Sequence, residues 1–414
     1  MQESRDTIGL DPSQKTILVV GFSVRAMVES AVGSGYKVIA LDAFGDRDTR
    51  ALTASYSISH DFSARYSQAA LLRARGRLDY DLVAYTSSLE NHPWVIERFA
   101  RLHPLIGNCP RVVRSIRSWE SFFCTMKQAG FNVPENFFTS DTVPKDAGRR
   151  WLVKPRLSGG GRGIAFYNGC SVTAGSQFIQ EYIPGKACSA SFVADGCGCV
   201  VLGITEQLVG LPQLGSGRFA YCGNILPLSD LFDPGIGPAV LEEVNRIAAF
   251  LTRTWNLVGL NGFDFILKGD RVYTIEVNPR YSASMELMEK AYSLPMFHFH
   301  VEAALRKKLP DFNLRERLDN NRFAGKGILF AGLDAVAPDT AGWHRMGIRD
   351  IPGQGEALQK GNPICTILAM QPSYDEVVSE LFFRAGILQK AVYGETQAAG
   401  SGEAGAFSMT AARK

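Results

Sequence analysis

Three oxygen-bearing side chains near residue 270 have the types and spacing of a magnesium site. Asp264 lies in the apolar segment "GFDFIL", and Glu276 and Asn278 lie two residues apart in "YTIEVNPR". Carboxylate and amide oxygens suit Mg²⁺, which proteins usually hold with few side chains plus the phosphate oxygens of a substrate. A solvated polar face on an edge hairpin is the alternative, but unpaired carboxylates are costly among such apolar neighbours. The segment therefore predicts a metal site that serves a phosphate.

The two carboxylates can share one metal only if they project from the same face of neighbouring strands. In an antiparallel pair, directly opposed residues share a face. A two-residue loop at the tip of this hairpin would oppose Asp264 to Ile275 and would separate Asp264 from Glu276. We therefore predict a loop of odd length, or a bulge, between Ile266 and Tyr273.

A lysine and a glycine-rich turn, in "WLVKPRLSGGGRG", form a second candidate for phosphate binding. Lys154 belongs to a predicted strand, and the turn contains Gly159, Gly160, Gly161 and Gly163. Glycines let backbone N–H groups approach phosphate oxygens without interference from a Cβ atom. Walker-type loops have the opposite order, with the lysine after the glycines at a helix start. The segment is thus either a strand-borne lysine with a mobile lid or a plain glycine hairpin turn.

The first 110 or so residues have the pattern of a small doubly wound α/β domain. Residues 15–42, "KTILVVGFSVRAMVESAVGSGYKVIALD", predict a strand, a helix and a second strand of a parallel sheet. A further strand is predicted at 81–88, with a helix after Pro93. The turn "GFSVR" lacks the G-x-G-x-x-G order of a dinucleotide fingerprint, so a nicotinamide site is disfavoured.

The remaining sequence predicts a larger α+β unit and a smaller third unit. Strands are expected around Lys154 and in the hairpin that carries Asp264, and a helix is expected from about Ser284 to Lys308. The last residues are small and polar, which predicts a disordered tail. The predicted domains are 1–112, 113–317 with a lid around 157–163, 318–395, and the tail 396–414.

Composition excludes several classes of protein. The chain has 414 residues, a net charge of +3 and 46% hydrophobic residues, which are values of a globular protein. The charge is too small to indicate binding to nucleic acid or an anionic membrane. No apolar run approaches the roughly 20 residues that span a bilayer. The polar N-terminus resembles neither a secretory signal nor a transit peptide, so a cytoplasmic protein is expected.

The order of these motifs resembles the ATP-grasp superfamily, the fold of biotin carboxylase, D-alanine ligase and many carboxylate–amine ligases. The order is a lysine on a strand, a glycine-rich lid, "QEYIPG", and then Asp…Glu-x-Asn-Pro-Arg. The resemblance covers residues 15 to about 305, and "GNPICTILA" resembles the C-terminal domain of the carboxylase-like branch. It implies an α/β (α+β) protein of ATP-grasp fold, with an N-terminal doubly wound pre-ATP-grasp domain and a small C-terminal β-rich domain.

The resemblance implies that ATP binds between two antiparallel sheets. Lys154 would contact the phosphates, and the glycine lid would fold over the β- and γ-phosphates. Backbone groups of Gln180 and Ile183 would bind the adenine edge. Glu181 would lie near the adenine amino group or the ribose, with Tyr182 in the same segment.

The resemblance also implies roles for the metal residues and for one arginine. Asp264, Glu276 and Asn278 would hold one or two Mg²⁺ (or Mn²⁺) ions that bridge phosphate oxygens. Arg280 would stabilise the transferring phosphoryl group or an acyl phosphate, and Arg280 and Lys154 are the predicted catalytic residues. No side chain needs to act as a nucleophile, because this chemistry depends on positioning and charge neutralisation.

One position departs from the family pattern. The family has a second nucleotide-binding lysine about eleven residues before a helix-ending glycine, and here the residue eleven before Gly130 is Trp119. Arg114, Arg117 or Lys127 could substitute for that lysine. The indole of Trp119 could stack on the base or belong to the core, and the frequent burial of Trp favours the core.

Six further residues are candidates for the substrate side. Arg25, Glu90 and His92 lie at or just after the ends of predicted parallel strands, where ligands gather in open sheets. Arg25 could receive a substrate carboxylate. The segment "GSGRFAYCGNILP" adds three residues that could line the acceptor side, namely Arg218, Tyr221 and Asn224. Ordinary loop positions are the alternative for all six.

The resemblance favours an ATP-dependent ligase that activates a carboxylate as an acyl phosphate and joins it to an amine, releasing ADP and phosphate. Its partners would be small-molecule carboxylates and amines, and the family expectation is a homodimer. A biotin-carboxylase-like carboxylase that uses bicarbonate is the first alternative. A non-catalytic ATP-binding regulatory protein is the second.

The opening segment resembles a narrower branch of ATP-grasp proteins. This segment, "GFSVRAMVESAVGSGYKVIALDAFGDRDT", is similar to carboligase-like proteins encoded among genes for one-carbon carrier cofactors such as methanopterin and methanofuran analogues. The similarity implies a role in one-carbon metabolism and cofactor biosynthesis. The specific expectation is a ligase that joins glutamate to tyrosine or tyramine.

Overall fold

The computed structural model describes residues 11–139, 143, 148–169, 171–173, 175–318 and 322–394. The tail predicted to be disordered, 396–414, lies outside these residues. Within the described chain the strands form a five-stranded sheet, a four-stranded sheet, an eight-stranded sheet and one short two-stranded ladder. No described helix has the length and apolar character needed to cross a membrane.

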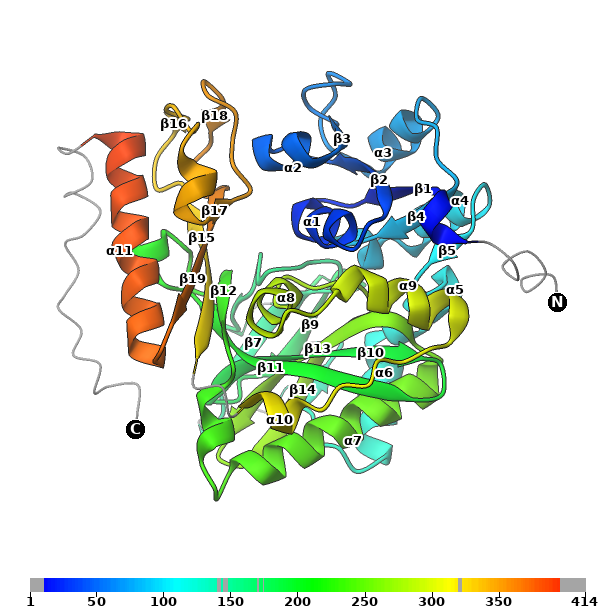
Figure 1. Cartoon of the computed structure of the whole chain (residues 1–414). Coiled ribbons are helices and arrows are strands. Elements are labelled where there is room, and N and C mark those ends of the chain that lie inside the picture. The colour runs from blue at the N-terminus through cyan, green and yellow to red at the C-terminus, as the bar shows by residue number, and fades with distance from the viewer. Residues whose placement is uncertain are drawn as a thin grey trace.

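The N-terminal sheet is parallel and has helices on both faces, as predicted (Figure 1). Its strand order is β3-β2-β1-β4-β5, and along β1 successive side chains alternate between the two faces. Ile17 and Val19 pack with helix α1, whereas Leu18 and Val20 pack with α3 and α4. The strands are β1 (Thr16–Val20), β2 (Lys37–Asp42), β3 (Ala54–Ser57), β4 (Leu82–Tyr85) and β5 (Leu105–Ile106). The helices are α1 (Arg25–Gly33), α2 (Arg47–Leu52), α3 (Gln68–Arg75) and α4 (Pro93–Ala100).

The eight-stranded sheet is the centre of the molecule, with the order β14-β13-β10-β11-β12-β15-β19-β17. Its last three strands come from the C-terminal unit, so that unit extends the central sheet. The predicted boundaries near 112 and 317 stay predictions. The strands are β10 (Lys186–Asp195), β11 (Cys199–Val209), β12 (Tyr221–Leu226), β13 (Val258–Lys268), β14 (Arg271–Asn278), β15 (Phe323–Phe330), β17 (Ile348–Arg349) and β19 (Pro363–Gln371).

The smaller sheet carries the predicted phosphate lysine. It has the order β6-β9-β7-β8, and its strands are β6 (Asn136–Phe137), β7 (Trp151–Pro155), β8 (Ala165–Phe166) and β9 (Gln177–Glu181). The glycine turn joins β7 to β8. The short ladder pairs β16 (Ala335–Val336) with β18 (Ala357–Leu358).

Helices cover both faces of the central sheet (Figure 1). One long helix, α7 (Gly237–Trp255), packs on the face that carries Phe192, Phe263 and Phe265. The opposite face packs against α8 (Met285–Tyr292) and α9 (Met296–Arg306), which separate it from the N-terminal sheet. The C-terminal strands are covered by α11 (Tyr374–Tyr393). The remaining helices are α5 (Pro110–Ile116), α6 (Trp119–Gln128), α10 (Leu314–Leu318) and the 3₁₀ turns η1 (Pro12–Gln14), η2 (Leu89–Asn91), η4 (Pro212–Leu214), η5 (Ser229–Phe232) and η6 (Trp343–Met346).

The single helix predicted from Ser284 to Lys308 is wrong. The chain forms α8 and α9, separated by a break at Ser293 to Pro295. Ser293 has the left-handed φ of 56°, and Pro295 cannot supply the N–H that a continuous helix needs. The break lets α9 turn against β5 and β13 instead of leaving the sheet.

The hairpin of β13 and β14 opposes Asp264 to Glu276, as the shared-metal prediction requires. Its tip is a two-residue turn, and the register is regular as far as the pair Phe265 and Thr274. A bulge at Ile275 then shifts the register by one residue. The predicted bulge is therefore present, but it lies at Ile275 and not between Ile266 and Tyr273, so its predicted position is wrong.

One buried histidine, His300 on α9, joins the N-terminal sheet to the central sheet. Its Nδ1 accepts the backbone N–H of Leu260 at 2.8 Å, and its Nε2 lies 3.2 Å from the carbonyl oxygen of Ile106. Gly259 makes room for the ring, because a Cβ atom there would lie 2.3 Å from Nδ1. Burial lowers the pKa of His300 to about 4. Only the neutral ring can accept the bond from Leu260.

We expect this histidine to make folding stability depend on pH. The pKa of His300 is about 4 when folded and 6.5 as an ordinary histidine, so between these values the unfolded chain binds more protons. The free energy of unfolding should therefore keep the full contribution of His300 above pH 6.5. It should fall between pH 6.5 and pH 4, by up to about 1.4 kcal/mol per pH unit. Urea unfolding at pH 7, 6 and 5 measures the slope.

The variant His300→Asn isolates this effect, because its side-chain oxygen can replace Nδ1 as an acceptor without titrating. Its stability should fall less steeply with acid than that of the parent. His344→Gln, at an exposed position of the C-terminal unit, is the matched control and should keep the parent slope. Equal slopes for the parent and His300→Asn would show that another group causes the dependence.

Candidate active site

A polar row crosses one face of the central sheet and contains the predicted metal residues. Strand pairing opposes Glu276 to Asp264, Asp264 to Ser189, and Ser189 to Thr205. The row continues through Gln207, which pairs with Asn224, and Asn224 pairs with Lys326. Farther along the same strands this face is apolar and packs on α8 and α9. From β14 to β15, the polar row thus consists of Glu276, Asp264, Ser189, Thr205, Gln207, Asn224 and Lys326.

The two carboxylates of the row have the electrostatics of a cation site. Burial and the charge of Glu276 raise the pKa of Asp264 to about 6, although hydrogen bonds from Ser189 and Gln207 oppose the shift. The amide of Asn278 donates to Asp264 Oδ2 at 3.3 Å. A divalent cation placed between the carboxylates would remove their repulsion.

This donor set fits magnesium or manganese completed by phosphate oxygens. Among the described residues, no group of three or more His, Cys, Asp or Glu side chains is arranged to hold a metal. The predicted set offers two carboxylates and one amide, so ligands from elsewhere must complete the coordination. That is the usual arrangement of Mg²⁺ at phosphate-transfer sites.

Lys154 reaches the same region from the smaller sheet. It is buried on β7, and its Nζ donates to Gln180 Oε1 at 3.1 Å. The pKa of Lys154 lies below its ordinary value because burial outweighs the charges of Glu276 and Asp264, which raise it. Because these acids act on Lys154 across the gap between two sheets, the structure brings the predicted lysine and metal residues together.

The predicted adenine segment lies at the end of β9, next to Lys154. Gln180 is paired with Leu152 inside the sheet, and its side chain bonds Lys154 and Asn136. The Gln180 side chain therefore holds Lys154, and the predicted contact of its backbone with adenine stays a prediction. Glu181 accepts a backbone N–H at its Oε2, and the predicted roles of Glu181, Tyr182 and Ile183 stay predictions.

The glycine lid lies against the loop that precedes β12. The backbone N–H of Tyr221 donates to the carbonyl oxygen of Gly160 at 3.0 Å. Gly161 has a φ of 74°, and a Cβ atom there would lie 1.7 Å from the carbonyl oxygen of Phe219. Only glycine permits this approach, so the lid in this structure spans from the smaller sheet to the central sheet.

Arg280 is held beside the metal residues by a carboxylate from the N-terminal unit. Its Nη2 donates to Glu90 Oε1 at 2.6 Å and to Asn278 Oδ1 at 3.0 Å. Burial lowers the pKa of Arg280, but Glu90, Glu276 and Asp264 together outweigh burial and raise this pKa above its ordinary value. The predicted catalytic arginine and the predicted substrate residue Glu90 are therefore one ion pair.

Of the three cations that could replace the missing second lysine, Arg117 is the one that contacts a predicted metal residue. Its Nη1 donates to Glu276 Oε1 at 2.7 Å, whereas Arg114 and Lys127 are exposed. The guanidinium also lies over the Trp119 ring at 4.6 Å. The Trp119 indole is buried, packs with Phe178 at 5.2 Å and belongs to the core, as expected.

The acceptor candidates differ in their surroundings. Tyr221 donates to Asn224, and the Asn224 amide donates to Thr205 Oγ1 at 2.9 Å. Asn224 is thus a member of the polar row, and Tyr221 is bonded to it. Arg218 is exposed, with its guanidinium 4.7 Å from the Phe166 ring centre. His92 is half-buried, and burial lowers its pKa although Glu90 raises it.

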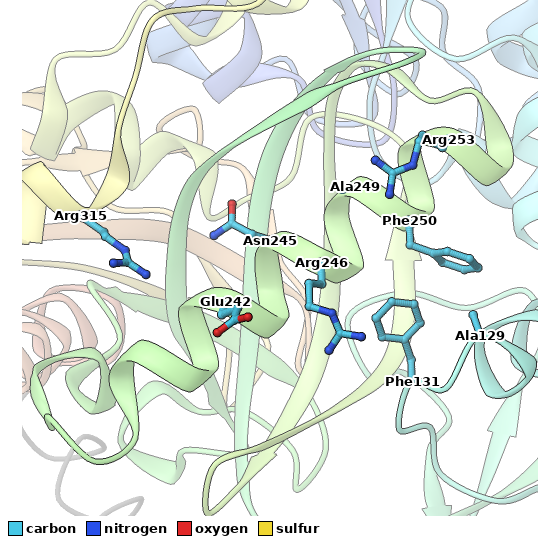
Figure 2. A pocket seen from close by; sticks show the side chains of 9 residues that line it. All are labelled: Ala129, Phe131, Glu242, Asn245, Arg246, Ala249, Phe250, Arg253 and Arg315. Atoms are coloured by element: carbon cyan, nitrogen blue, oxygen red, sulfur yellow. The ribbon is translucent and has the colours of Figure 1, made fainter.

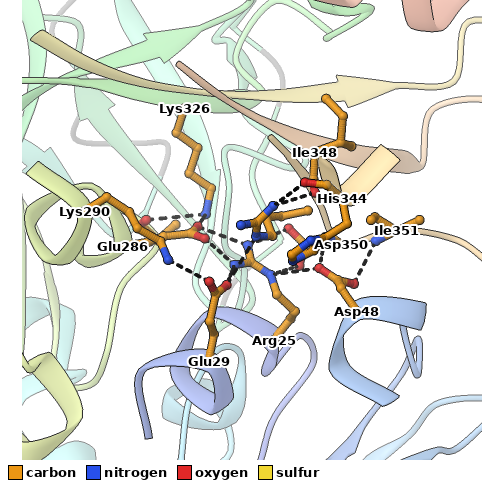
Figure 3. Close-up of polar contacts among 12 residues, drawn as sticks. Arg25, Glu29, Asp48, Glu286, Lys290, Lys326, His344, Ile348, Asp350 and Ile351 are labelled. Carbon is orange, nitrogen blue, oxygen red and sulfur yellow. Dashed lines mark hydrogen bonds and ion pairs between the residues drawn. The ribbon is translucent and has the colours of Figure 1, made fainter. Parts of the chain in front are cut away.

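Arg25 is not available to a substrate, which contradicts its prediction (Figure 3). Its guanidinium is 1% exposed and is surrounded by carboxylates of the protein itself. Nε and Nη2 each bond Asp350 at 3.0 Å, and the guanidinium also bonds Glu286 and Glu29. The residue therefore joins the N-terminal unit to α8 and to the C-terminal unit.

Several residues of the polar region were missed by the sequence analysis, among them Ser189, Thr205 and Gln207 of the polar row and the pair Lys326 and Glu286. Lys326 is buried and donates to Glu286 Oε2 at 2.7 Å, and both residues border the site without belonging to any predicted motif. A single lysine inside the apolar strand "FAGKGILF" was the available signal. Its partner Glu286 stands on a helix and could not be inferred from spacing.

A surface hollow of about 720 Å³ lies outside α7, away from these residues (Figure 2). Arg246, Arg253 and Phe250 border it, and none of the predicted site residues does. The site is therefore defined by its converging side chains and not by this hollow.

Comparison with known proteins identifies a domain family in the part of the chain that carries most of these residues. Residues 120–284 match the family described as the ATP-grasp domain. The chain contains an ATP-grasp domain. The matched range begins at α6 and ends just before α8, so it includes Lys154, the lid and the metal residues.

Two curated relatives match the chain to different extents. An uncharacterised protein of Methanocaldococcus jannaschii is 24% identical over 382 residues, or 86% of this chain and 88% of the relative. The carbamoyl phosphate synthase large chain of Thermoanaerobacter pseudethanolicus is 32% identical over 140 residues. That match spans 34% of this chain and only 12% of the synthase.

Solved structures share the whole fold. A biotin carboxylase of Campylobacter jejuni, solved as a complex with β,γ-ATP, has a TM-score of 0.68 at 14% identity and covers 92% of each chain. An ADP complex of N5-carboxyaminoimidazole synthetase from Staphylococcus aureus has a TM-score of 0.65 at 16% identity. It covers 90% of this chain and 97% of its own. The predicted ATP-grasp fold is confirmed.

We expect Glu276→Gln to impair metal–nucleotide binding without unfolding the ATP-grasp domain. The amide keeps an acceptor for Arg117 but loses the charge, and losing one such contact costs on the order of 3 kcal/mol in turnover, about 100-fold. Mn²⁺ binding in the presence of ADP, followed by electron paramagnetic resonance, should weaken too, because the metal loses a charged ligand. Glu242→Gln, on the exposed side of α7, is the control. Mn²⁺ affinity within twofold of the parent would remove Glu276 from the site.

A second pair of variants tests which cation replaces the missing lysine. Arg117→Ala should weaken ATP binding at least tenfold, because a charge-assisted bond to phosphate contributes roughly 1.5–3 kcal/mol. Arg114→Ala, less than one helix turn away but exposed and paired with Glu97 at 3.5 Å, should leave ATP binding unchanged. Calorimetric titration with Mg²⁺ and ATP compares them. Equal affinities for the two variants would reject Arg117.

Proposed function

We propose that the protein is an ATP-dependent ligase that joins a carboxylate to an amine through an acyl phosphate. The observation that supports this most strongly is the opposed pair Asp264 and Glu276, facing Lys154 and next to Arg280. This group suits the transfer of a phosphoryl group, and it contains no side chain positioned as a nucleophile. ATP with Mg²⁺ or Mn²⁺ is the proposed cofactor set.

In the proposed first step, an oxygen of the substrate carboxylate attacks the γ-phosphorus of ATP, and the bond to the β-phosphate oxygen breaks. ADP and an acyl phosphate result. Lys154 and Arg117 would bind the phosphates, and Arg280 would offset the charge that develops on the transferring group. Asp264, Glu276 and Asn278 would hold the metal ion, which supplies charge neutralisation when it is bound.

In the second step, the amine attacks the acyl carbon and phosphate leaves with the bonding electrons, while the amine loses a proton. Activation is needed because a carboxylate anion resists nucleophiles and its oxygen is a poor leaving group. The lid excludes water, which would otherwise hydrolyse the acyl phosphate. The products are an amide, ADP and phosphate.

A carboxylase that uses bicarbonate is the second candidate. The observation that favours it is the likeness to a biotin carboxylase over 92% of both chains, including the C-terminal strands. Bicarbonate would take the place of the carboxylate and form carboxyphosphate by the same phosphoryl transfer. The geometry suits both reactions, so the substrate decides between them.

A non-catalytic ATP-binding regulator is the third candidate. A sensor does not need to retain two carboxylates for a metal that would neutralise the charge on a transferred phosphate. The complete set Asp264, Glu276 and Asn278, with Arg280 beside it, supports turnover over sensing.

We further propose glutamate as the acid and tyrosine or tyramine as the amine, in the biosynthesis of a methanofuran-type one-carbon cofactor. The support is the resemblance of the N-terminal segment stated above. A cytoplasmic location and a homodimer are part of the same proposal.

The reaction class can be tested by trapping the intermediate. With ATP, Mg²⁺, glutamate and hydroxylamine, a ligase should form glutamyl hydroxamate, because hydroxylamine attacks an acyl phosphate as an amine does. Replacing hydroxylamine with tyramine should give the amide mass. A panel of other acids and amines extends the assay.

The outcomes separate the three candidates. Hydroxamate with another acid but not with glutamate would reject the substrate and keep the reaction class. ADP release that requires bicarbonate and no other acid would indicate the carboxylase. The absence of ADP release with every acid, despite tight ATP binding, would indicate the regulator.

A further inference from the structure

The one-turn helix η2 touches three separate parts of the site. Glu90 Oε1 accepts from Arg280 at 2.6 Å. Asn91 Oδ1 accepts from Arg117 Nη2 at 2.6 Å, and Asn91 Nδ2 donates to the carbonyl oxygen of Ser158, at the start of the lid, at 3.3 Å. Two adjacent residues of the N-terminal unit thus contact the catalytic arginine, the proposed nucleotide arginine and the lid.

The strand that precedes η2 holds the backbone on both sides of Arg280. The Tyr85 hydroxyl lies between two carbonyl oxygens, 3.0 Å from that of Asn108 and 3.1 Å from that of Pro279, and can donate its one proton to either. Thr86 donates to the carbonyl oxygen of Tyr281 at 3.3 Å. The carboxyl end of β4 therefore fixes the main chain at Arg280, and Glu90 fixes its side chain.

The residues of η2 that make these contacts are buried, and several polar atoms beside them have no hydrogen-bond partner in the described chain. Glu90 is 2% exposed and Asn91 is 7% exposed. In the described chain, Glu90 Oε2, Arg117 Nε and Arg280 Nε are buried without a hydrogen-bond partner. Unpaired buried polar atoms are costly, so these three atoms beside η2 are available to bond a ligand, a water molecule or a residue of a closed state.

We propose that η2 is the positioning element of the site, which couples the placing of Arg280 to the position of the glycine lid. Glu90 positions Arg280, and Asn91 ties the lid and Arg117 to the end of β4. The consequence for Arg280 rests on the proposed function, whereas the tie to the lid does not. Because ligands bind at the carboxyl ends of parallel strands, a substrate held after β4 would act on the lid and on Arg280 together.

The tie to the lid is tested by limited proteolysis, which needs no substrate. Trypsin can cleave after Arg162, an exposed residue of the lid. Asn91→Ala should speed this cleavage about fivefold, the factor expected for losing one hydrogen bond when cleavage follows lid opening. Mass spectrometry identifies the cut. Asn362→Ala, an exposed amide of the C-terminal unit, is the control and should leave the rate unchanged.

An Asn91→Ala rate within twofold of the parent, with the control equally unchanged, overturns the tie. An equal increase in both variants also overturns it, since general loosening would then be the cause. Thermal unfolding of the same samples, expected to shift by no more than about 2 °C, shows that the fold is retained.

The positioning of Arg280 is tested by separating kcat from KM in the ligase assay. Glu90→Ala should lower kcat about 100-fold, because Arg280 loses its fixed orientation in the transition state, and the KM for ATP should change less than threefold. Glu90→Gln keeps the acceptor that orients Arg280 and should retain kcat to within about tenfold of the parent. If Glu90 served only to stabilise the fold, Glu90→Gln would not recover kcat relative to Glu90→Ala while the KM for ATP stays unchanged.

Parent kcat in both Glu90 variants, or equal loss in both, overturns the positioning role. A parent protein that turns over no acid refutes the proposed function, and the proteolysis of the lid then still decides whether η2 holds it. The two failures are therefore distinguishable.

Discussion

The register of one antiparallel pair is the constraint on which the site depends. A bulge at Ile275 opposes Asp264 to Glu276, and without it Glu276 would point into the core beneath α7. Because a shift of one residue moves a side chain to the other face of a sheet, this single extra residue decides whether a two-carboxylate site exists. The other members of the polar row follow from ordinary strand alternation, so they need only the correct pairing of β10 to β15.

Charge balance then shapes the surroundings of that pair. Three carboxylates, Asp264, Glu276 and Glu90, face three cations, Lys154, Arg117 and Arg280. Arg117 pairs with Glu276 and Arg280 pairs with Glu90, so buried charge is compensated before a nucleotide binds. Removing one partner of such a pair would leave the other buried and unpaired, which is far more costly than exchanging both.

Much of the fold could be predicted from the sequence, because strand and helix periodicity is local. The bulge could not be placed, since polar Thr274, Glu276 and Asn278 alternate with apolar residues as in an unbroken strand. Arg25 shows a second limit. At the end of a parallel strand it has the position of a ligand-binding residue, but its bidentate partner Asp350 lies 325 residues away in sequence. No local pattern contains such a pairing.

The carboxylate of Glu286 explains why the C-terminal strands belong to the site. Glu286 stands on α8 and bonds both Arg25 of the N-terminal unit and Lys326 of β15, and the pKa of Glu286 lies well below its ordinary value because these two cations outweigh burial. Two buried cations that share one carboxylate hold their two units against the same helix. Lys326 is also the last member of the polar row, opposite Asn224. The end of the polar row is therefore set by a contact that all three units make.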